Sequence, residues 1–320
     1  MVTIRDIAKE AGVSVSTASR ALNDNPHVSQ ATRQRVQQLA EQMGYVPNLN
    51  AKNLTNGEAN AVGVIFPTSD RVAQANPFYI DLLRGINLEL VAHHAVLSIA
   101  IGSTPEMLLQ NVRAMVQQSH IKKFIFLYSD VNDEVAQWLR DQDIPFVIVG
   151  HPIDHGDDLF VDNDNFEAGA AAARYLLTHY HVKHPVFVES NQGWEYEMNR
   201  REGFERVMAA YHIPVRIISI TAETSNTETI HAIENNPAID GVIATDDDRA
   251  MEFYRLWHLT QTETIPFISF NQTVAKQLVD NEFHSINLFP ERMGEAAAQL
   301  LFQSDESTRA RHRLIPFEIN

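Results

Sequence analysis

The first 22 residues carry two short amphipathic segments joined by a glycine, and this spacing restricts the local fold more than any other feature of the chain. Thr3 and Asp6 form a capping pair at the start of the first segment, whose apolar face is Ile4, Ile7, Ala8 and Ala11. Gly12 supplies a left-handed turn. Ser14 then caps a second helix, and its inward residues are expected to be Val15, Ala18, Ala21 and Leu22.

A third helix is predicted between a Ser29 cap and Gly44, with the apolar stripe Val36, Leu39, Ala40 and Met43. Three short helices around a tight turn are typical of a helix–turn–helix unit. The polar side chains on its second helix are Ser16, Thr17, Ser19 and Arg20. Arginine can pair with a guanine edge, and hydroxyls reach bases or phosphates, so this unit is predicted to bind DNA. The alternative is a helical bundle with no nucleic-acid role.

The charge of the chain is unevenly distributed. The formal net charge of −16 is unusual for a DNA-binding protein. Residues 1–60, however, carry six basic against five acidic side chains, whereas the rest carries 19 against 36. We therefore expect the acidic body to repel DNA and the near-neutral head to approach it, with two paired heads needed for firm binding.

Cysteine content and hydropathy predict a location. There are no cysteines, which excludes disulfides and suits a reducing compartment. No N-terminal signal segment is evident, and no apolar run approaches the 18 residues that a membrane span needs. The chain is expected to be cytoplasmic, with no membrane association.

Residues 47–60 are predicted to link the head to the body. Pro47 excludes a helix immediately before it, but residues 48–54 can form about two helical turns if docking stabilises them. Asn50 and Leu54 would then contact DNA, with Leu54 as an apolar wedge in the minor groove. The alternative for Leu54 is packing on the body.

From residue 61 onward, short apolar runs alternate with longer amphipathic stretches. The predicted strands are 62–66, 96–101, 124–128, 146–149, 186–188, 217–220, 242–244 and 267–270, and helices include 80–93, 105–119 and 166–179. Such alternation predicts parallel sheets with helices on both faces, here two doubly wound α/β subdomains. The predicted domains are 1–46 for the head, 61–161 with 291–320 for the first subdomain, and 162–290 for the second. Crossovers are expected near 162–165 and 288–290.

The residues after the predicted strands share one chemistry. Carboxylates, amides and aromatic rings recur there, including residues 76–79 with Phe78, 128–130, His151, 162–165, Trp194, 245–248 and Asn271. Ligands of doubly wound sheets bind beyond the carboxyl ends of the strands. Polar groups that bind hydroxyls, beside rings that stack on C–H edges, predict a neutral sugar.

Several motifs together resemble the lactose-repressor family of bacterial transcription regulators. They are the head, Gly44-Tyr-x-Pro-Asn, Val62-Gly-Val-Ile, Arg200-x-x-Gly-Phe, the acidic strand end at 245–248 and Met293-Gly294. Within that family, the segments 47–51, 76–78, 126–128 and 161–165 look most like maltose-operon repressors of Gram-positive bacteria. The resemblance implies a homodimer on a near-palindromic operator, with maltose or a maltodextrin as effector.

The resemblance also implies individual roles. Val15, Ser16 and Arg20 correspond to major-groove contacts, which conflicts with the inward orientation expected for Val15 above. The positions that correspond to the effector cleft are Tyr79, Tyr128, His151, Asp162, Trp194, Arg200, Asp246 and Asn271. Two departures weaken the sugar assignment: position 271 is more often Asp in the family, and 221–226 lacks an aromatic residue that some members have.

Other chemistries are disfavoured. The histidine-rich segments 151–155 and 179–184 lack a helical metal-ligand pair, and adjacent acids at 246–248 alternate in direction and are expected to include a helix cap. No phosphate loop or dinucleotide fingerprint occurs, and no nucleophile is paired with a base. The chain is therefore expected to need no cofactor or metal and not to be an enzyme. The alternative to a regulator is a sugar-binding protein without regulatory DNA binding.

Overall fold

The computed structural model describes residues 2–45, 59–68, 76–221, 224–236, 238–271, 283–303 and 311–319. The chain divides into two compact units, residues 1–59 and 60–320. No helix within the described residues is long and apolar enough to cross a membrane.

The N-terminal unit contains the three helices that the sequence predicts. They are α1 (Ile4–Glu10), α2 (Val15–Leu22) and α3 (Gln30–Gln42). Asp6 accepts hydrogen bonds from the backbone and hydroxyl of Thr3, and Ser14 Oγ accepts one from Thr17 N at 3.1 Å. Gly12 adopts φ +62°, as the turn requires. The core of the unit is formed by side chains of all three helices, among them Ile7, Ala18, Ala21 and Val36.

The prediction that Val15 faces inward is wrong. The exposed fraction of Val15 is 44%, whereas Ala18 and Ala21 are fully buried. Val15 is the first residue of α2, directly after the Ser14 cap. Val15 precedes Ala18, the first buried residue of α2, by three positions. It therefore lies at the exposed start of the helix rather than on its buried face.

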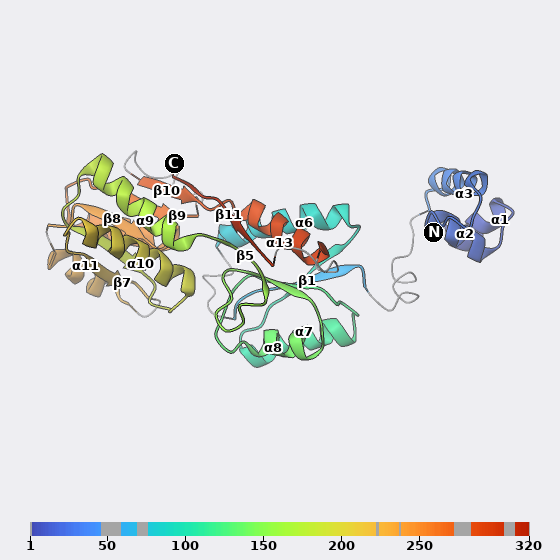
Figure 1. Ribbon diagram of the computed structural model, residues 1–320, viewed down its shortest axis with the longest axis horizontal. Coiled ribbons are helices and arrows are strands. Elements are labelled where there is room, and N and C mark those ends of the chain that lie inside the picture. The colour runs from blue at the N-terminus through green and yellow to red at the C-terminus, as the bar shows by residue number, and fades with distance from the viewer. Residues whose placement is uncertain are drawn as a thin grey trace. The chain divides into compact units, whose positions relative to one another are not determined.

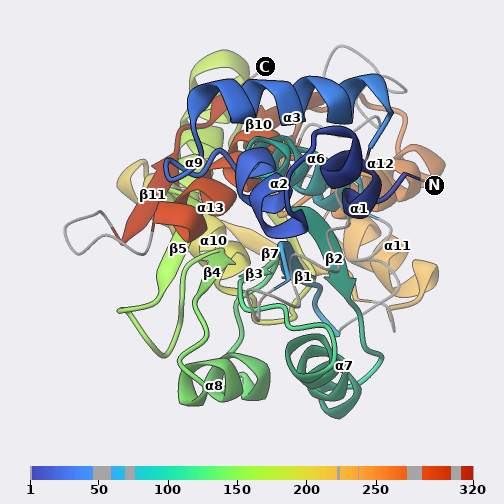
Figure 2. The ribbon, with the colours of Figure 1, turned by 90° about the vertical axis from the view of Figure 1, so that its right-hand side faces the viewer.

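The first subdomain is built on a six-stranded sheet of order β11-β5-β4-β3-β1-β2. All its neighbouring strands are parallel. The strands are β1 (Ala61–Ile65), β2 (Val96–Ala100), β3 (Phe124–Phe126), β4 (Phe146–Val149), β5 (Leu159–Asn163) and β11 (His312–Ile315). Helices α6 (Pro77–Ala92) and α13 (Pro290–Gln303) cover one face, and α7 (Pro105–Gln117) and α8 (Glu134–Asp141) cover the other (Figures 1 and 2).

The second subdomain is built on a sheet of order β12-β10-β9-β8-β6-β7, in which β12 alone runs antiparallel. Its strands are β6 (Pro185–Glu189), β7 (Arg216–Ser219), β8 (Gly241–Ala244), β9 (Phe267–Phe270), β10 (Phe283–Asn287) and β12 (Glu318–Ile319). Its helices are α9 (Asn165–Tyr175), continued by the π-helical turn η1 (Leu176–Tyr180), α10 (Glu195–Ala210), α11 (Asn226–Glu234) and α12 (Asp247–Thr260). The predicted α/β architecture is confirmed.

Two glycines of the family motifs lie where the backbones of two neighbouring helices are in direct contact. A Cβ on Gly203 of α10 would lie 2.0 Å from the carbonyl oxygen of Phe166 in α9. A Cβ on Gly294 of α13 would lie 2.1 Å from the carbonyl oxygen of Leu82 in α6. Each subdomain therefore contains one tightly packed helix pair, which fixes the residues near Arg200 and Met293.

The chain passes between the two sheets three times: after β5, after β10 and after β11. Asn163 joins all three passages, because its Nδ2 donates to Leu288 O at 3.1 Å and to Ile315 O at 2.8 Å. The sequence suggested two crossovers and kept the whole C-terminal segment with the first sheet. Residues 318–319 instead pair with β10 of the second sheet. Asp162 and Asn163, placed at the start of the second subdomain by the sequence, belong to β5 of the first sheet. The other predicted domain bounds are still a prediction.

Candidate functional site

A cavity of about 130 Å³ lies between the two subdomains, beyond the carboxyl ends of their strands. Its lining includes all nine residues that the sequence predicts for the effector cleft: Phe78, Tyr79, Tyr128, His151, Asp162, Trp194, Arg200, Asp246 and Asn271. The first five belong to the first subdomain, and the last four to the second. The structure thus assembles the predicted set around one space, while their role as ligand contacts stays a prediction.

Arg200 is the buried cation of this cavity. Its guanidinium lies between the rings of Phe270 and Tyr196, 4.4 and 4.8 Å from their centroids. Nε donates to Asn165 Oδ1 at 2.9 Å, and Nη1 donates to Thr245 O at 2.6 Å. Within the described residues, Nη2 has no hydrogen-bond partner, so this nitrogen can donate to a ligand. Burial lowers the pKa of Arg200, against the opposing effect of nearby acids.

Asp162 lies at the end of β5 and is held by its own strand and the following helix. Its Oδ1 accepts from Asn163 N at 2.8 Å and from Asn165 Nδ2 at 3.0 Å. Burial raises the pKa of this carboxyl to about 6, although the hydrogen bonds and the charge of Arg200 act in the opposite direction. Asn165 therefore links Asp162 to Arg200 in one buried network.

Asp246 caps α12, as was expected of one of the acids at 246–248. Its Oδ1 accepts from Arg249 N at 2.8 Å. The carboxyl is buried, which raises its pKa. Burial, with a contribution from Asp246, raises the pKa of Tyr79 across the cavity to about 12. Tyr79 therefore stays a neutral hydroxyl beside an acid, and both groups can bind ligand hydroxyls.

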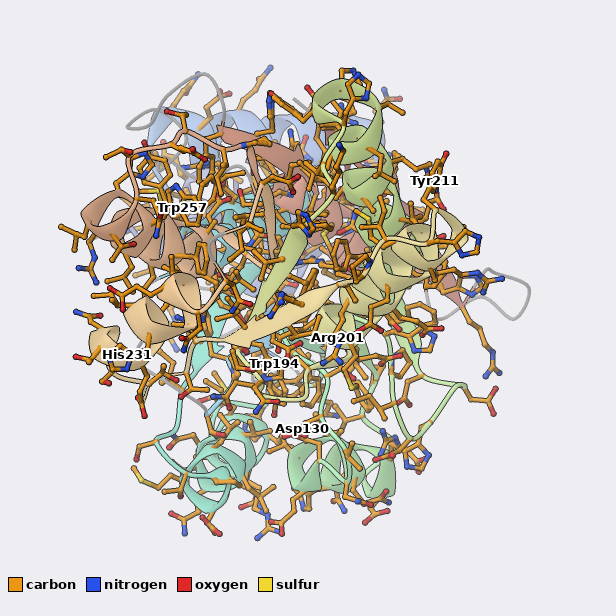
Figure 3. All side chains as sticks on the ribbon, turned by 90° about the vertical axis from the view of Figure 1, so that its left-hand side faces the viewer. Asp130, Trp194, Arg201, Tyr211, His231 and Trp257 are labelled. Carbon is orange, nitrogen blue, oxygen red and sulfur yellow. The ribbon has the colours of Figure 1, made fainter. Side chains whose placement is uncertain are left out.

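Aromatic rings form the less polar walls of the cavity. Trp194 is the N-cap residue of α10 and stacks on Tyr196 with centroids 5.5 Å apart. Trp194 and Arg201, both labelled in Figure 3, lie at the start and in the middle of this helix, but Arg201 is outside the cavity lining. On the opposite side, Tyr79 contacts the rings of Phe66 and Phe78.

The hydroxyl of Tyr128 is engaged elsewhere. It donates to Asp133 Oδ2 at 2.7 Å, and Asp133 caps α8 outside the cavity lining. Burial raises the pKa of Tyr128. Tyr128 therefore offers the cavity its ring rather than its hydroxyl.

The sequence interpretation did not include Glu195 and Tyr196 in the cleft, and it gave Asn163 and Asn165 no individual role. Asn163 and Asn165 fall within the strand-end segment 162–165 that the sequence did single out. Glu195 and Tyr196 directly follow Trp194, and an N-terminal acid is common at a helix start. Nothing in the local pattern indicated that this helix start faces the cavity.

Two of the acids at 246–248 are engaged in hydrogen bonds within the protein. Asp246 is a helix cap, and Asp247 accepts hydrogen bonds from the hydroxyls of Ser269 and Ser285. Within the part of the chain that the structure describes, no group of three His, Asp or Glu side chains could hold a metal ion.

On the N-terminal unit, the four predicted DNA contacts of α2 differ in availability. Val15, Ser16 and Arg20 are exposed, while Thr17 is partly buried. Ser14 Oγ lies 2.9 Å from Ser16 Oγ and 2.8 Å from Thr17 Oγ1, so both hydroxyls also bond to the cap. The backbone oxygen of Arg20 accepts from Asn25 N at 3.0 Å, but its guanidinium has no hydrogen bond or ion pair with another described residue and is free to donate. Asn50 and Leu54 lie outside the described residues.

Comparison with protein families gives two matches. Residues 3–48 match the model for bacterial regulatory proteins of the lacI family. Residues 59–319 match the model for periplasmic binding proteins and the sugar binding domain of the LacI family. Together they account for nearly the whole chain.

Individual relatives and solved structures agree with these family matches. The HTH-type transcriptional regulator MalR of Staphylococcus xylosus is 29% identical over 93% of this chain and 90% of its own length. Three solved structures show the same fold. A probable maltose operon repressor of Staphylococcus aureus has a TM-score of 0.75 at 22% identity (82% of this chain, 96% of that one). A complex of the transcriptional regulator CelR with cellobiose has a TM-score of 0.72 at 20% identity and covers 100% of this chain and 98% of that one. A lac repressor dimer bound to operator has a TM-score of 0.78 at 17% identity and covers 99% of this chain and 97% of that one.

Proposed function

The chain belongs to the lacI family of bacterial regulatory proteins and is a DNA-binding transcriptional regulator, and we propose that it represses a carbohydrate-utilisation operon under the control of a neutral sugar. The resemblance inferred from its motifs is thereby confirmed, as is the expectation that it is not an enzyme, since its relatives are transcriptional regulators. The observation that carries the proposal is the cavity that combines Arg200, Asp162 and Asp246 with aromatic walls.

The charges in the cavity favour a neutral ligand. Asp162, Glu195 and Asp246 supply three carboxyl groups, against the guanidinium of Arg200 and the imidazole of His151. An anionic ligand would meet repulsion from these acids in a region of low dielectric. Hydroxyls, in contrast, can donate to the acids and accept from Arg200 Nη2, while Trp194 and Tyr79 offer ring faces to C–H edges.

We propose maltose or a maltodextrin as the effector. The support is the similarity to a probable maltose operon repressor of S. aureus and to MalR of S. xylosus. The CelR neighbour was solved with cellobiose, a second disaccharide, which the same experiments must include.

Binding of the sugar would bring the two subdomains together and change the affinity of the heads for the operator. Coupling between two sites typically amounts to about 1–3 kcal/mol, which changes operator affinity by roughly 5- to 150-fold. At the operator, Val15, Ser16, Thr17 and Arg20 would contact bases or phosphates of the major groove. Asn50 and Leu54 of the linker would contact the minor groove.

A homodimer would present two heads to a near-palindromic operator. One exposed apolar surface of the first subdomain supports a second copy as the partner: Leu88 and Val91 on α6, Ile99 on the edge strand β2, and Ile101 directly after that strand. Apolar residues that are 45–62% exposed on adjacent elements are characteristic of an interface. Leu88→Asp with Ile99→Lys should give monomers in analytical ultracentrifugation and weaken operator binding; an unchanged dimer would place the interface elsewhere.

The regulatory proposal is tested by titrating maltose, maltotriose and cellobiose into a complex of the full chain with operator DNA. One of these sugars should release the DNA, and ligand at a hundredfold excess over its Kd should stabilise the chain by about 2.7 kcal/mol. If no sugar changes either DNA affinity or melting temperature, the neutral-sugar proposal is wrong. A sugar that strengthens DNA binding would make it a corepressor instead of an inducer.

Arg20→Ala tests the head separately. The variant should lose about 1–3 kcal/mol of discrimination at one operator position, because a forked contact to a base edge would be removed. Arg35→Ala on α3 is the matched control, since Arg35 is also an exposed arginine of the head but lies on another helix. Equal losses on operator and random DNA would make Arg20 a phosphate contact.

A further inference from the structure

A contact between an imidazole and a carboxylate connects the two walls of the cavity. His151 follows β4 in the first subdomain, and Glu195 is the first residue of α10 in the second. His151 Nδ1 lies 3.3 Å from Glu195 Oε1. Both residues line the cavity, so the pair connects its two walls beside the space where a ligand would lie.

The second carboxylate oxygen of Glu195, Oε2, has no hydrogen-bond partner in the part of the chain that the structure describes. This oxygen is buried. Buried polar atoms in folded proteins nearly always have a partner, so an oxygen left without one at the wall of a cavity indicates a donor that a ligand supplies. Glu195 also directly follows Trp194, whose ring forms part of the same wall.

The charged residues near this pair do not donate a hydrogen bond to Glu195 Oε2. Asp162 also lines the cavity, and its Oδ1 already accepts two hydrogen bonds, from Asn163 and Asn165. Arg200, the nearby buried cation, donates from Nε and Nη1 to Asn165 and Thr245. Neither group donates to Glu195 Oε2, so among the described residues this oxygen can still accept a hydrogen bond.

We propose that Glu195 is a sugar-contacting residue that also latches the two subdomains, with Oε1 held by His151 and Oε2 accepting a hydrogen bond from a sugar hydroxyl. The proposal rests on the sugar-binding function proposed above and adds a residue that the sequence interpretation did not include. A carboxylate only accepts hydrogen bonds. Glu195 would therefore select sugars that present a donor beside the face stacked on Trp194, while its contact with His151 holds the two subdomains together.

The affinity test uses the full-length chain and maltose, measured by isothermal titration calorimetry. Glu195→Gln keeps the shape of the side chain but replaces the charged acceptor and weakens the His151 contact. We expect its Kd for maltose to rise at least tenfold, in line with the strength of hydrogen bonds to charged groups. His151→Gln should raise Kd less, and the double variant should show less than the sum of the two effects, because the two side chains act as a pair.

Two variants serve as matched controls. His155→Gln changes an exposed histidine in the same loop as His151, and Glu202→Gln changes an exposed acid on the same helix as Glu195. Neither residue lines the cavity. Both variants should bind maltose as the unmodified chain does. Equal affinity of Glu195→Gln and these controls for maltose would overturn the sugar contact.

The latch is tested by a distance measurement that does not require a ligand. The chain has no cysteine, so Glu134→Cys on α8 and Met198→Cys on α10 give two unique, exposed labelling positions, one on each subdomain. The labelled chain is diluted with unlabelled chain so that each dimer carries one label pair. Without sugar, Glu195→Gln and His151→Gln should both lengthen and broaden the spin-label distance distribution, and the controls should not.

The outcomes separate the two levels of the proposal. If maltose fails to bind the unmodified chain, the proposed effector is wrong, yet the label distances without sugar still test the latch. If maltose shortens the label distance equally in the unmodified chain and in both variants, and the variants show no change without sugar, the latch is overturned.

Discussion

The two walls of the cavity hold their side chains in different ways. On the second subdomain, Arg200 is clamped between two rings and hydrogen-bonded from two nitrogens, and Asp246 is fixed as the cap of α12. On the first subdomain, His151 is half exposed on a loop, and Tyr128 directs its hydroxyl to Asp133. The comparison indicates that Arg200 and Asp246 are held more firmly than His151, and we expect the loop of His151 to adjust during the proposed closure.

The largest expected effect comes from removing the clamped cation. Arg200→Leu leaves Asn165 and the Thr245 carbonyl without donors and Asp162 without its counter-charge. We expect a loss of about 3–5 kcal/mol in the free energy of unfolding, measured by urea denaturation, and no detectable sugar binding.

Arg201→Leu is the matched control for this prediction. Arg201 is the next residue on α10, its side chain is 39% exposed, and it pairs with Glu189 and Glu205. Since partly exposed ion pairs contribute little, its loss should cost about 1 kcal/mol or less. Similar losses for both variants would remove the basis for regarding Arg200 as specially held.

Asp246→Asn separates the capping role from the ligand role. Asparagine also accepts a hydrogen bond as an N-cap, so α12 should keep its stability to within about 0.5 kcal/mol. The affinity for sugar should fall by about one order of magnitude, since a charged acceptor becomes a neutral amide. Urea denaturation and calorimetry measure the two effects; a large loss of stability with unchanged affinity would contradict the assignment.

The pH dependence of binding sharpens the comparison for Asp162. Burial raises the pKa of this carboxyl to about 6. A sugar hydroxyl that donates to it favours the ionised form, so binding lowers the pKa and releases a proton. Affinity should therefore rise between pH 5 and pH 7 and level off above. Asp248, whose pKa burial also raises to about 6, contributes a background that Asp162→Asn leaves in place. An equally steep profile in that variant would exclude Asp162 as the titrating group.

The smallest effect is expected for Tyr128→Phe. The hydroxyl that it removes donates to Asp133 rather than to the cavity. Sugar affinity should change less than threefold, while stability falls by about 1 kcal/mol because Asp133 loses a donor. A tenfold loss of affinity in calorimetry would show that the hydroxyl turns toward the ligand on binding.

Prediction from sequence was most successful where the signals are local. The helices of the head followed from caps at Thr3, Ser14 and Ser29 and from apolar spacing, and all three are present. The eight apolar runs became strands of the two sheets. Strands β5, β10, β11 and β12 were missed. Polar residues such as Asp162, Asn163, His284 and Asn287 interrupt the apolar character of β5 and β10, β11 begins with His312 and Arg313, and β12 has two residues only.

The candidate site was predicted in its membership but not in its geometry. The family resemblance and the rule for strand ends predicted nine residues of the effector cleft, and all nine line one cavity. Neither source indicated that Tyr128 bonds to Asp133, that Asn165 bridges Asp162 and Arg200, or that Glu195 retains a free oxygen. These are contacts between side chains, and residue types at a strand end do not determine them.

The sequence by itself determined the helical head, the alternation of strands and helices, and the polar chemistry at the strand ends, because caps and periodicity act within a few residues. The tertiary structure decided the exposure of Val15, the pairing of β12 with β10, and the junction at Asn163. That junction joins Asn163 to carbonyls 125 and 152 residues away. Bonds over such separations form only once both sheets have folded, so no local window of the sequence contains them.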